Sequence, residues 1–237
     1  MTKSSRIVQG LLIFVVLALL LLVIWSAQQV ATPLLEYRQA QGEYQVLREV
    51  ARPQSLPPPD LPLDEVLEEI EEESESPIDW DALRAINPNI VGWIVILGTH
   101  IDHPVVQGPD NARYLSYTFS GERNPSGAIF MDVGSAPDFS SPNTIIHGHN
   151  MQNGSMFAEL LQYRNLSFLE AHPVIIIYTP DGVLMYEILS ARIIPARNAV
   201  YSADYEPEWA GGRQIATLST CVNGSPDQRM VVQGQLM

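Results

Sequence analysis

The stretch QIATLSTCVNGSPDQRMVVQGQLM (Gln214–Met237) decides how the fold is interpreted. It contains two runs rich in β-branched and apolar residues, one ending at Cys221 and the other beginning at Arg229. The loop between them, residues 222–228, contains Asn, Gly and Pro, and this pattern is typical of a β-hairpin. A hairpin brings the end of one strand beside the start of the next. The sequence therefore predicts that Cys221 and Arg229 lie at the same end of a sheet.

Cys221 is the only cysteine among 237 residues, so no intramolecular disulfide can form. A fixed positive charge beside a thiol stabilises the thiolate, which is the form that attacks a carbonyl carbon. The guanidinium of Arg229 is also suited to binding a developing oxyanion or peptide carbonyls. The alternative is an inert Cys221 that packs as a small hydrophobic residue.

A second segment, NTIIHGHNM (Asn143–Met151), supplies two imidazoles. His147 and His149 are two residues apart and share one face if the strand continues. His149 stands where the strand ends, and an imidazole there can exchange protons with a thiol or a leaving amine. A cysteine and a histidine from distant segments are the pattern expected of a cysteine acyl-transfer enzyme.

Eight short runs of β-branched and aromatic residues, bounded by turn residues, predict strands. They are Val91–Gly98, Ile101–Val106, Gly127–Asp132, Asn143–His149, Pro173–Thr179, Val183–Ile194, Arg213–Thr220 and Arg229–Leu236. One helical patch capped by Ser155 interrupts them and extends toward Ala171. The pattern predicts a mainly β fold: a closed or nearly closed antiparallel barrel, because closure removes exposed strand edges.

The N-terminal region predicts a membrane anchor. Ile7–Trp25 has nineteen residues without a charge, long enough at about 1.5 Å per residue to cross a bilayer core of about 30 Å. Lys3 and Arg6 precede this stretch, so the positive-inside tendency places the N-terminus in the cytoplasm and the rest of the chain outside. A cleaved signal peptide is the alternative, since small residues follow Trp25.

A stalk is expected between this anchor and the folded domain. Pro33–Ala51 fits an amphipathic helix interrupted by Gly42, and five prolines within Pro53–Pro62 fit a stiff connector. Asp64–Asp81 then holds ten carboxylates and no Lys or Arg, which accounts for most of the net charge of −14. Such a solvated acidic run argues against a nucleic-acid partner, which would require a basic patch.

The folded domain is expected to begin near Ile78, with Asp79 capping a short helix through Ala85. The predicted organisation has three parts. Residues 1–25 form a cytoplasmic tip and transmembrane helix, residues 26–77 an extracellular helix and stalk, and residues 78–237 the catalytic barrel.

From Asp79 to the end, roughly two thirds of the chain, the sequence resembles the sortases, and among them class B. The stretches that carry the resemblance are NPNIVGWIVILGTHIDHPVVQGPDNARYL (Asn87–Leu115), GAIFMD (Gly127–Asp132), IIHGHNM (Ile145–Met151) and TLSTC (Thr217–Cys221), with an arginine eight residues after the cysteine. Their combination is far more selective than any one of them.

The resemblance implies an eight-stranded sortase-type β-barrel with short helices, and N-terminal helices packed on it. It implies that Cys221 attacks the carbonyl after the threonine of a C-terminal sorting signal and forms a thioacyl enzyme. His149 would protonate the leaving amine and deprotonate the incoming one, and Arg229 would steady the substrate. Thr220, with Ser219 beside it, would belong to the substrate and oxyanion site.

The implied partners are proteins that carry a sorting signal, Asn-Pro-x-Thr-like by analogy, and an amine acceptor on cell-wall peptidoglycan or on a pilin. No cofactor and no metal are implied. Together with the predicted anchor, the resemblance implies a single-pass protein of the cell membrane whose catalytic domain is extracellular.

Several alternatives stay open at the level of sequence. His147 stands where the family commonly has an aromatic or aliphatic residue, so either histidine is a candidate for the proton-transfer role, and His149 is favoured because it follows Gly148 in the GHN pattern. His103, where a tyrosine is usual, is interpreted as a packing residue. A zinc site would use His147, His149 and Cys221 with His100 or His103. A peptidase that only hydrolyses and a non-catalytic surface module are the other interpretations.

Overall fold

The structure is a computed structural model that describes residues 3–51, 65 and 76–237. It divides into two compact units, one reaching Gln39 and the other running from Ala40 to Met237. The expected proline-rich connector Pro53–Pro62 lies outside the described residues, as does most of the acidic run that follows it.

Helix α1 (Lys3–Ala51) forms all of the first unit that is described. The predicted interruption at Gly42 was wrong, because the helix continues through this residue. A glycine inside a helix costs only about 1 kcal/mol relative to alanine, which flanking helix formers readily offset. Among the described residues α1 is the one helix long and apolar enough to cross a bilayer, with a mean hydropathy of 2.4 in its most apolar part.

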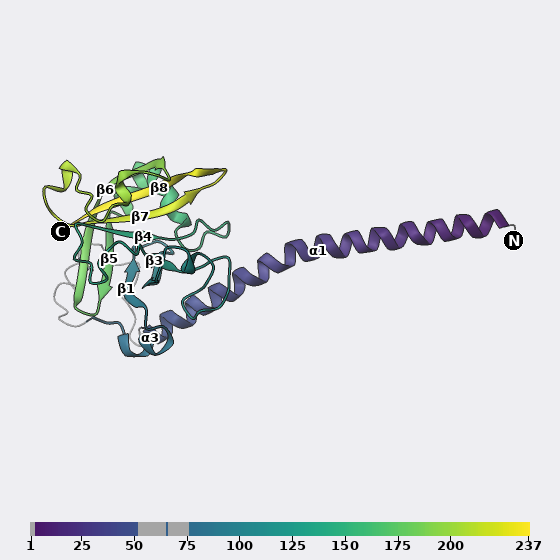
Figure 1. The fold of residues 1–237 in the computed structure, drawn as a ribbon, viewed down its shortest axis with the longest axis horizontal. Helices are drawn as coiled ribbons and strands as arrows, with labels where there is room; N and C mark the ends of the chain where they lie inside the picture. The colour runs from purple at the N-terminus through teal and green to yellow at the C-terminus, as the bar shows by residue number, and fades with distance from the viewer. Residues whose placement is uncertain (1–2, 52–64, 66–75) are drawn as a thin grey trace. The chain divides into compact units, whose positions relative to one another are not determined.

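The second unit is a closed β-barrel, and Figure 1 labels all its strands except β2. Its strands are β1 (Ile90–Val95), β2 (Asp102–Gln107), β3 (Ile129–Met131), β4 (Asn143–His147), β5 (Val174–Thr179), β6 (Gly182–Pro195), β7 (Ile215–Val222) and β8 (Ser225–Leu236). The order around the barrel is β1-β2-β3-β4-β7-β8-β6-β5, and β5 pairs with β1 to close it. The closed eight-stranded barrel was therefore predicted correctly.

The barrel is mixed rather than antiparallel, which corrects the expected strand directions. β2 pairs with β3 in parallel, and β4 pairs with β7 in parallel. Parallel neighbours need a connection of a dozen or more residues, and the segments 108–128 and 148–214 between these strands provide it. The second parallel pair matters for function, since it sets the end of β4 beside the end of β7.

Short helices fill the connections. They are α3 (Trp80–Ile86), η1 (Arg113–Leu115), η2 (Ala158–Arg164), α4 (Leu166–Ala171), η3 (Ala199–Tyr201) and η4 (Glu208–Ala210). Asp79 caps α3 as expected, because its Oδ1 accepts from the amide of Ala82 at 2.9 Å. The helix expected after Ser155 forms as the 3₁₀ helix η2 and the short α4, and the Ser155 hydroxyl bonds to Asn153 instead of capping it.

The last turns of α1, from Ala40 onward, belong to the barrel unit. Their buried side chains are Ala40, Tyr44, Leu47 and Ala51, spaced three or four residues apart as on one face of a helix. The Tyr44 hydroxyl donates to the carbonyl of Gly127 at 2.7 Å, and the Asp79 amide donates to the carbonyl of Ala51 at 2.8 Å. The first contact fixes the end of α1 to the connection that precedes β3, and the second fixes it to the start of α3.

A ladder of polar side chains joins the start of β4 to the first part of β7 and the last part of β8. The Gln233 amide donates to the Thr217 hydroxyl at 3.0 Å, and this hydroxyl donates to Asn143 Oδ1 at 2.6 Å. The Asn143 amide then donates to the carbonyls of Val200 and Ser202, both at 2.8 Å. All three side chains are fully buried, so this polar ladder satisfies its own hydrogen bonds without water.

Candidate active site

A cavity of about 270 Å³ opens at the ends of β4, β7 and β8. Its walls include all the residues that the sequence predicted for the site: His149, Ser219, Thr220, Cys221 and Arg229. The other lining residues are Asn111, Leu115, Phe130, Asp132, His147, Gly148, Ala196 and Tyr201. Side chains from distant parts of the sequence therefore face one space, which we call the active-site cavity.

Cys221 and Arg229 are cross-strand partners in the β7–β8 hairpin, as the sequence predicted. The strands continue beyond them to Val222 and Ser225, so the turn is much shorter than the expected loop 222–228. Gly224 makes this possible, because its φ of 72° suits a tight hairpin turn and is rarely adopted by other residues. Cys221 is exposed at this end of the barrel.

The guanidinium of Arg229 is held against its own hairpin. Its Nη1 donates to the carbonyls of Pro226 at 2.7 Å and Gln228 at 2.8 Å, and the side chain is half-buried. Two backbone acceptors therefore restrict where the positive charge lies. Because its side chain is already held in place, Arg229 loses less conformational entropy on binding an anion than a freely moving surface arginine would.

His149 reaches the cavity because β4 runs parallel to β7. His147 pairs with Ser219, and one residue further the Gly148 amide donates to the Ser219 carbonyl at 3.1 Å. Gly148 has no room for a side chain, since a Cβ there would collide with Ile129 and lie 2.7 Å from the ring of Phe157. The close approach thus requires glycine directly before His149.

The imidazole of His149 is oriented by a backbone group. Its Nε2 lies 2.8 Å from the carbonyl oxygen of Leu115, at the end of η1. A carbonyl oxygen can only accept, so Nε2 carries the hydrogen and Nδ1 is the nitrogen left for proton exchange. Sequence reasoning missed Leu115, and no side-chain signal points to a role played by a carbonyl.

Thr220 and Ser219 tie the end of β7 to its surroundings. The Thr220 hydroxyl donates to the Gly148 carbonyl at 2.8 Å, and the side chain is almost fully buried. A hydroxyl has one hydrogen, so in this arrangement Thr220 cannot also donate to an oxyanion. The Ser219 hydroxyl lies 2.8 Å from the hydroxyl of Tyr201, a residue that the sequence did not single out.

Tyr201 stays a neutral phenol at this position. Burial raises its pKa, and the hydrogen bond with Ser219 and the positive charge of Arg229 oppose this effect. The ring also stacks on His147, with ring centroids 6.0 Å apart. Tyr201 therefore forms an uncharged wall between the thiol side of the cavity and the second histidine.

His147 is paired with a carboxylate. Its Nε2 lies 3.1 Å from Oδ2 of Asp132, which also accepts from the side-chain amide of Asn111 at 2.7 Å. Partial burial works to raise the pKa of the Asp132 carboxyl, but the hydrogen bonds it accepts outweigh burial and hold this pKa below its ordinary value. His147 is thus committed to Asp132, whereas the ring contact of His149 is to a neutral carbonyl.

Asn150 links the segment after β4 to the hairpin tip. Its side-chain amide donates to the Cys221 carbonyl at 2.9 Å and to Asn223 Oδ1 at 3.0 Å. The residue is the last letter of the GHN pattern, so the motif contained the signal, but its contact with the hairpin was not foreseen. Through it the residues flanking His149 and Cys221 are joined by hydrogen bonds.

The zinc site considered from the sequence would need His100 or His103 to join the residues of the active-site cavity. Both histidines instead line a separate cavity, and neither lines the active-site cavity. In the part of the chain that is described, no group of three or more His, Cys, Asp or Glu side chains is arranged to hold a metal ion.

Comparison with known proteins agrees with the fold and the motifs. The family model described as Sortase domain matches residues 94–237. Sortase B of Listeria monocytogenes is 34% identical over 180 residues, covering 65% of this chain and 72% of that protein.

Two solved structures are similar over most of their length. The Staphylococcus aureus sortase B–substrate complex has a TM-score of 0.69 at 25% identity, covering 86% of this chain and 98% of the other. A sortase B complexed with triglycine has a TM-score of 0.68 at 25% identity, covering 84% and 98%. The matched family model spans more than half of the sequence. It includes β4, β7 and β8 with the cavity between their ends. The chain therefore belongs to the sortase family and is like the class B sortases.

Proposed function

We propose that this protein is a membrane-anchored cysteine transpeptidase with Cys221 as nucleophile, His149 as proton-transfer partner and Arg229 as the fixed positive group. Class B sortases are cysteine transpeptidases, so the reaction type follows from the family. The observation that carries the residue assignment is that all three side chains line one cavity at the end of the barrel.

The proposed reaction has two halves. In the first, the Cys221 thiolate attacks the backbone carbonyl after threonine, an S–C bond forms, the C–N bond breaks, and His149 gives a proton to the leaving amine. In the second, the nitrogen of an acceptor amine attacks the thioester, His149 takes its proton, and the thiolate leaves. Two observations support this reaction. Cys221 is exposed, so a peptide can reach it, and the Nδ1 of His149 is left for proton exchange.

Arg229 would act on charge rather than on protons. Its guanidinium is held by two carbonyls of its own hairpin and stands across the strand pair from Cys221. From there it stabilises negative charge on the tetrahedral intermediate. Ser219 and Thr220 would shape the oxyanion side of the cavity, with Thr220 acting first as an anchor for Gly148.

The anchor is proposed to be the apolar part of α1, residues 7–25. Sortases are membrane-associated, and α1 is long and apolar enough to span a bilayer. Lys3 and Arg6 favour a cytoplasmic N-terminus, which would leave the barrel outside the cell.

The proposed substrates are surface proteins with a C-terminal sorting signal of the Asn-Pro-x-Thr type, and the proposed acceptor is an amine on peptidoglycan or on a pilin. The relatives support the chemical class on both sides, since one sortase B structure holds a substrate and another holds triglycine.

The test uses the full chain in detergent, a quenched fluorescent peptide with an Asn-Pro-x-Thr signal, and triglycine as acceptor. We expect a peptide–triglycine conjugate, identified by mass spectrometry, and a loss of about 10³-fold or more in rate for Cys221→Ala. Ser225→Ala on the same hairpin is the matched control and should keep the activity of the parent.

Other outcomes have definite meanings. Cleavage that survives Cys221→Ala would overturn the mechanism. Cleavage that depends on Cys221 but yields only the hydrolysed peptide, with or without triglycine, would replace the transpeptidase by a peptidase. A Cys221 that iodoacetamide does not alkylate, in a chain without cleavage, would indicate a non-catalytic module.

A further inference from the structure

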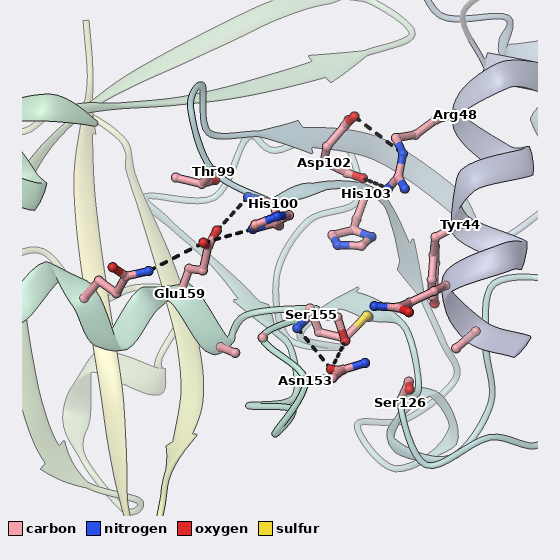
Figure 2. A pocket seen from close by; sticks show the side chains of 16 residues that line it. Tyr44, Arg48, Thr99, His100, Asp102, His103, Ser126, Asn153, Ser155 and Glu159 are labelled. Atoms are coloured by element: carbon pink, nitrogen blue, oxygen red, sulfur yellow. Dashed lines mark hydrogen bonds and ion pairs between the residues drawn. The ribbon is translucent and has the colours of Figure 1, made fainter. Parts of the chain in front are cut away.

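A second cavity, of about 590 Å³, lies between the last turns of α1 and the barrel wall. Figure 2 shows it with the α1 residues Tyr44 and Arg48 on one side, His100–His103 above, and the connection Asn153–Ser155 below. We call it the helix-side cavity. It shares no lining residue with the active-site cavity, and its size is typical of small-molecule sites.

Its inner wall carries polar atoms that no protein group satisfies. His103 is only 3% exposed, and neither of its ring nitrogens has a hydrogen-bond partner. The carbonyl of His100 faces this ring without reaching hydrogen-bond geometry. The buried hydroxyl of Ser126, another residue that lines the cavity, is also unpaired.

The imidazole of His103 is neutral at physiological pH. Burial lowers its pKa to about 4, although the neighbouring Asp102 carboxylate favours the charged form. A neutral imidazole has one N–H donor and one bare acceptor nitrogen. Leaving both nitrogens buried without hydrogen bonds costs free energy. A ligand that accepts one hydrogen bond and donates another would recover this free energy.

The charges around the helix-side cavity are already paired with one another. Arg48 lies 4.0 Å from Asp102 and donates to its carbonyl at 3.2 Å. His100 contacts Glu159 twice, through its amide at 2.6 Å and its ring at 3.0 Å, as the dashed lines in Figure 2 show. A charged ligand would have to compete with these pairs, so a neutral ligand fits better.

The rest of the lining is rich in neutral polar groups. Besides Ser126 it holds the amides and hydroxyls of Gln41, Thr99, Asn153, Ser155 and Gln162. A peptide that binds by adding a strand would need a free strand edge, and the barrel is closed. Many hydroxyl and amide partners, with the unpaired nitrogens of His103 among them, suit a small neutral molecule that carries several hydroxyl groups.

We propose that the helix-side cavity binds a neutral saccharide, with His103 and Ser126 holding a hydroxyl or acetamido group at its inner end. Gln41, Asn153 and Gln162 provide further hydrogen bonds nearer the surface, while the buried Tyr44 packs edge-on against His103. This binding is independent of the catalytic role of Cys221.

One wall of this cavity belongs to the segment that carries His149. Asn150 and Met156 form a β-bridge, and the amide of Phe157 donates to the His149 carbonyl at 2.9 Å. Asn153, Ser155 and Met156 line the helix-side cavity within the loop closed by these bonds. A bound saccharide should therefore slow amide hydrogen exchange in 153–156.

The experiment titrates the full chain in detergent, carrying Cys221→Ala so that no turnover intervenes, with N,N′-diacetylchitobiose and with cellobiose. Binding is followed by isothermal titration calorimetry and by hydrogen exchange of residues 153–156. We expect saturable binding of at least one disaccharide with a millimolar or tighter Kd. Preference for the first probe would assign the inner contact to an acetamido group, and equal binding would assign it to hydroxyls.

The variants locate the site. His103→Phe keeps an aromatic ring but removes both nitrogens, and we expect it to weaken binding about tenfold. Because this change is buried, Gln41→Ala on the exposed rim is the second variant, expected to weaken binding severalfold, and Gln45→Ala on the same helix outside the cavity is the matched control. No binding at millimolar concentration, binding that Gln41→Ala and His103→Phe leave unchanged, or tighter binding of a neutral tetrapeptide would each overturn the proposal and leave the cavity to water or to another ligand.

Discussion

Opposite ends of β4, β7 and β8 carry two polar regions built on the same strands but with opposite properties. Toward one end, the polar ladder of Asn143, Thr217 and Gln233 is fully buried, and its groups bond to one another. At the other end, Cys221 is exposed and His149 and Arg229 are half-buried around an open cavity. The difference teaches that buried polar groups with complete hydrogen bonds set the strand pairing, while those at the rim are positioned for an incoming molecule.

The largest effect on stability should come from the polar ladder. Asn143→Ala removes the side-chain donor to the carbonyls of Val200 and Ser202 and the acceptor for the Thr217 hydroxyl, so we expect a loss of about 2–4 kcal/mol in the free energy of unfolding. Urea unfolding of the full chain in detergent, followed by tryptophan fluorescence, measures it.

The matched control is the next residue. The buried hydroxyl of Thr144 has no hydrogen-bond partner, so Thr144→Val should be neutral or stabilising by up to about 1 kcal/mol. Equal destabilisation by the two variants would mean that packing at β4, rather than the completed hydrogen bonds, holds this end of the strands.

Gly148→Ala tests the active-site end of the same strands. The added methyl group collides with Ile129 and Phe157, and relieving this overpacking should cost about 1–3 kcal/mol. Because His149 follows directly, we also expect turnover of the quenched peptide to fall about 100-fold. Gly42→Ala, where the new methyl group meets open space in α1, should not reduce stability. Unchanged turnover in Gly148→Ala would show that His149 does not depend on this close approach.

Thr220→Val should have a smaller effect at the rim. It removes the bond to the Gly148 carbonyl, and we expect about 1 kcal/mol of stability and about tenfold in kcat/KM to be lost. Thr220→Ser keeps the hydroxyl and should restore both. If Thr220→Val lowered kcat by several hundredfold with unchanged stability, the hydroxyl would instead act on the reacting substrate.

The smallest effect concerns the Asp132–His147 pair. The pKa of Asp132 is lower in the folded chain than its unfolded value of about 3.9, so its contribution to stability is present above that pH and is lost as the pH falls further. Thermal unfolding measured between pH 3 and 6 should show a shallower decline below about pH 4 for Asp132→Asn than for the parent. Parallel pH profiles for the two proteins would show that the Asp132 carboxylate does not contribute to the pH dependence of stability.

Much of the fold could be predicted because its signals are local. Each strand is a β-branched run between turn residues, and the Gly224 hairpin fixes the pairing of Cys221 with Arg229. The strand directions could not be predicted, since the parallel pairings of β2 with β3 and β4 with β7 join distant segments. The prediction that Ser155 caps the following helix was wrong for another reason: the Ser155 hydroxyl bonds to the nearby Asn153 instead.

The candidate site divides in the same way. Cys221, His149 and Arg229 stand in motifs, whereas the contacts that orient them come from elsewhere. The Leu115 carbonyl holds His149, and Tyr201 from the segment between β6 and β7 reaches Ser219. The role of a backbone carbonyl cannot be inferred from residue type, and Tyr201 lies outside every motif. The helix-side cavity was also invisible, because it exists only once the last turns of α1 are fixed to the barrel.

Because Cys221 is the single cysteine of the chain, it is also a unique attachment site for a spectroscopic label. A trifluoromethyl or nitroxide reagent that reacts with thiols can attach only at Cys221, so no background cysteines need to be removed by mutation. The label would sit one residue pair from the Asn223–Gly224 turn, beside Arg229. Fluorine or spin-resonance spectra of the unaltered sequence would then report directly on what enters the space between the ends of β4, β7 and β8.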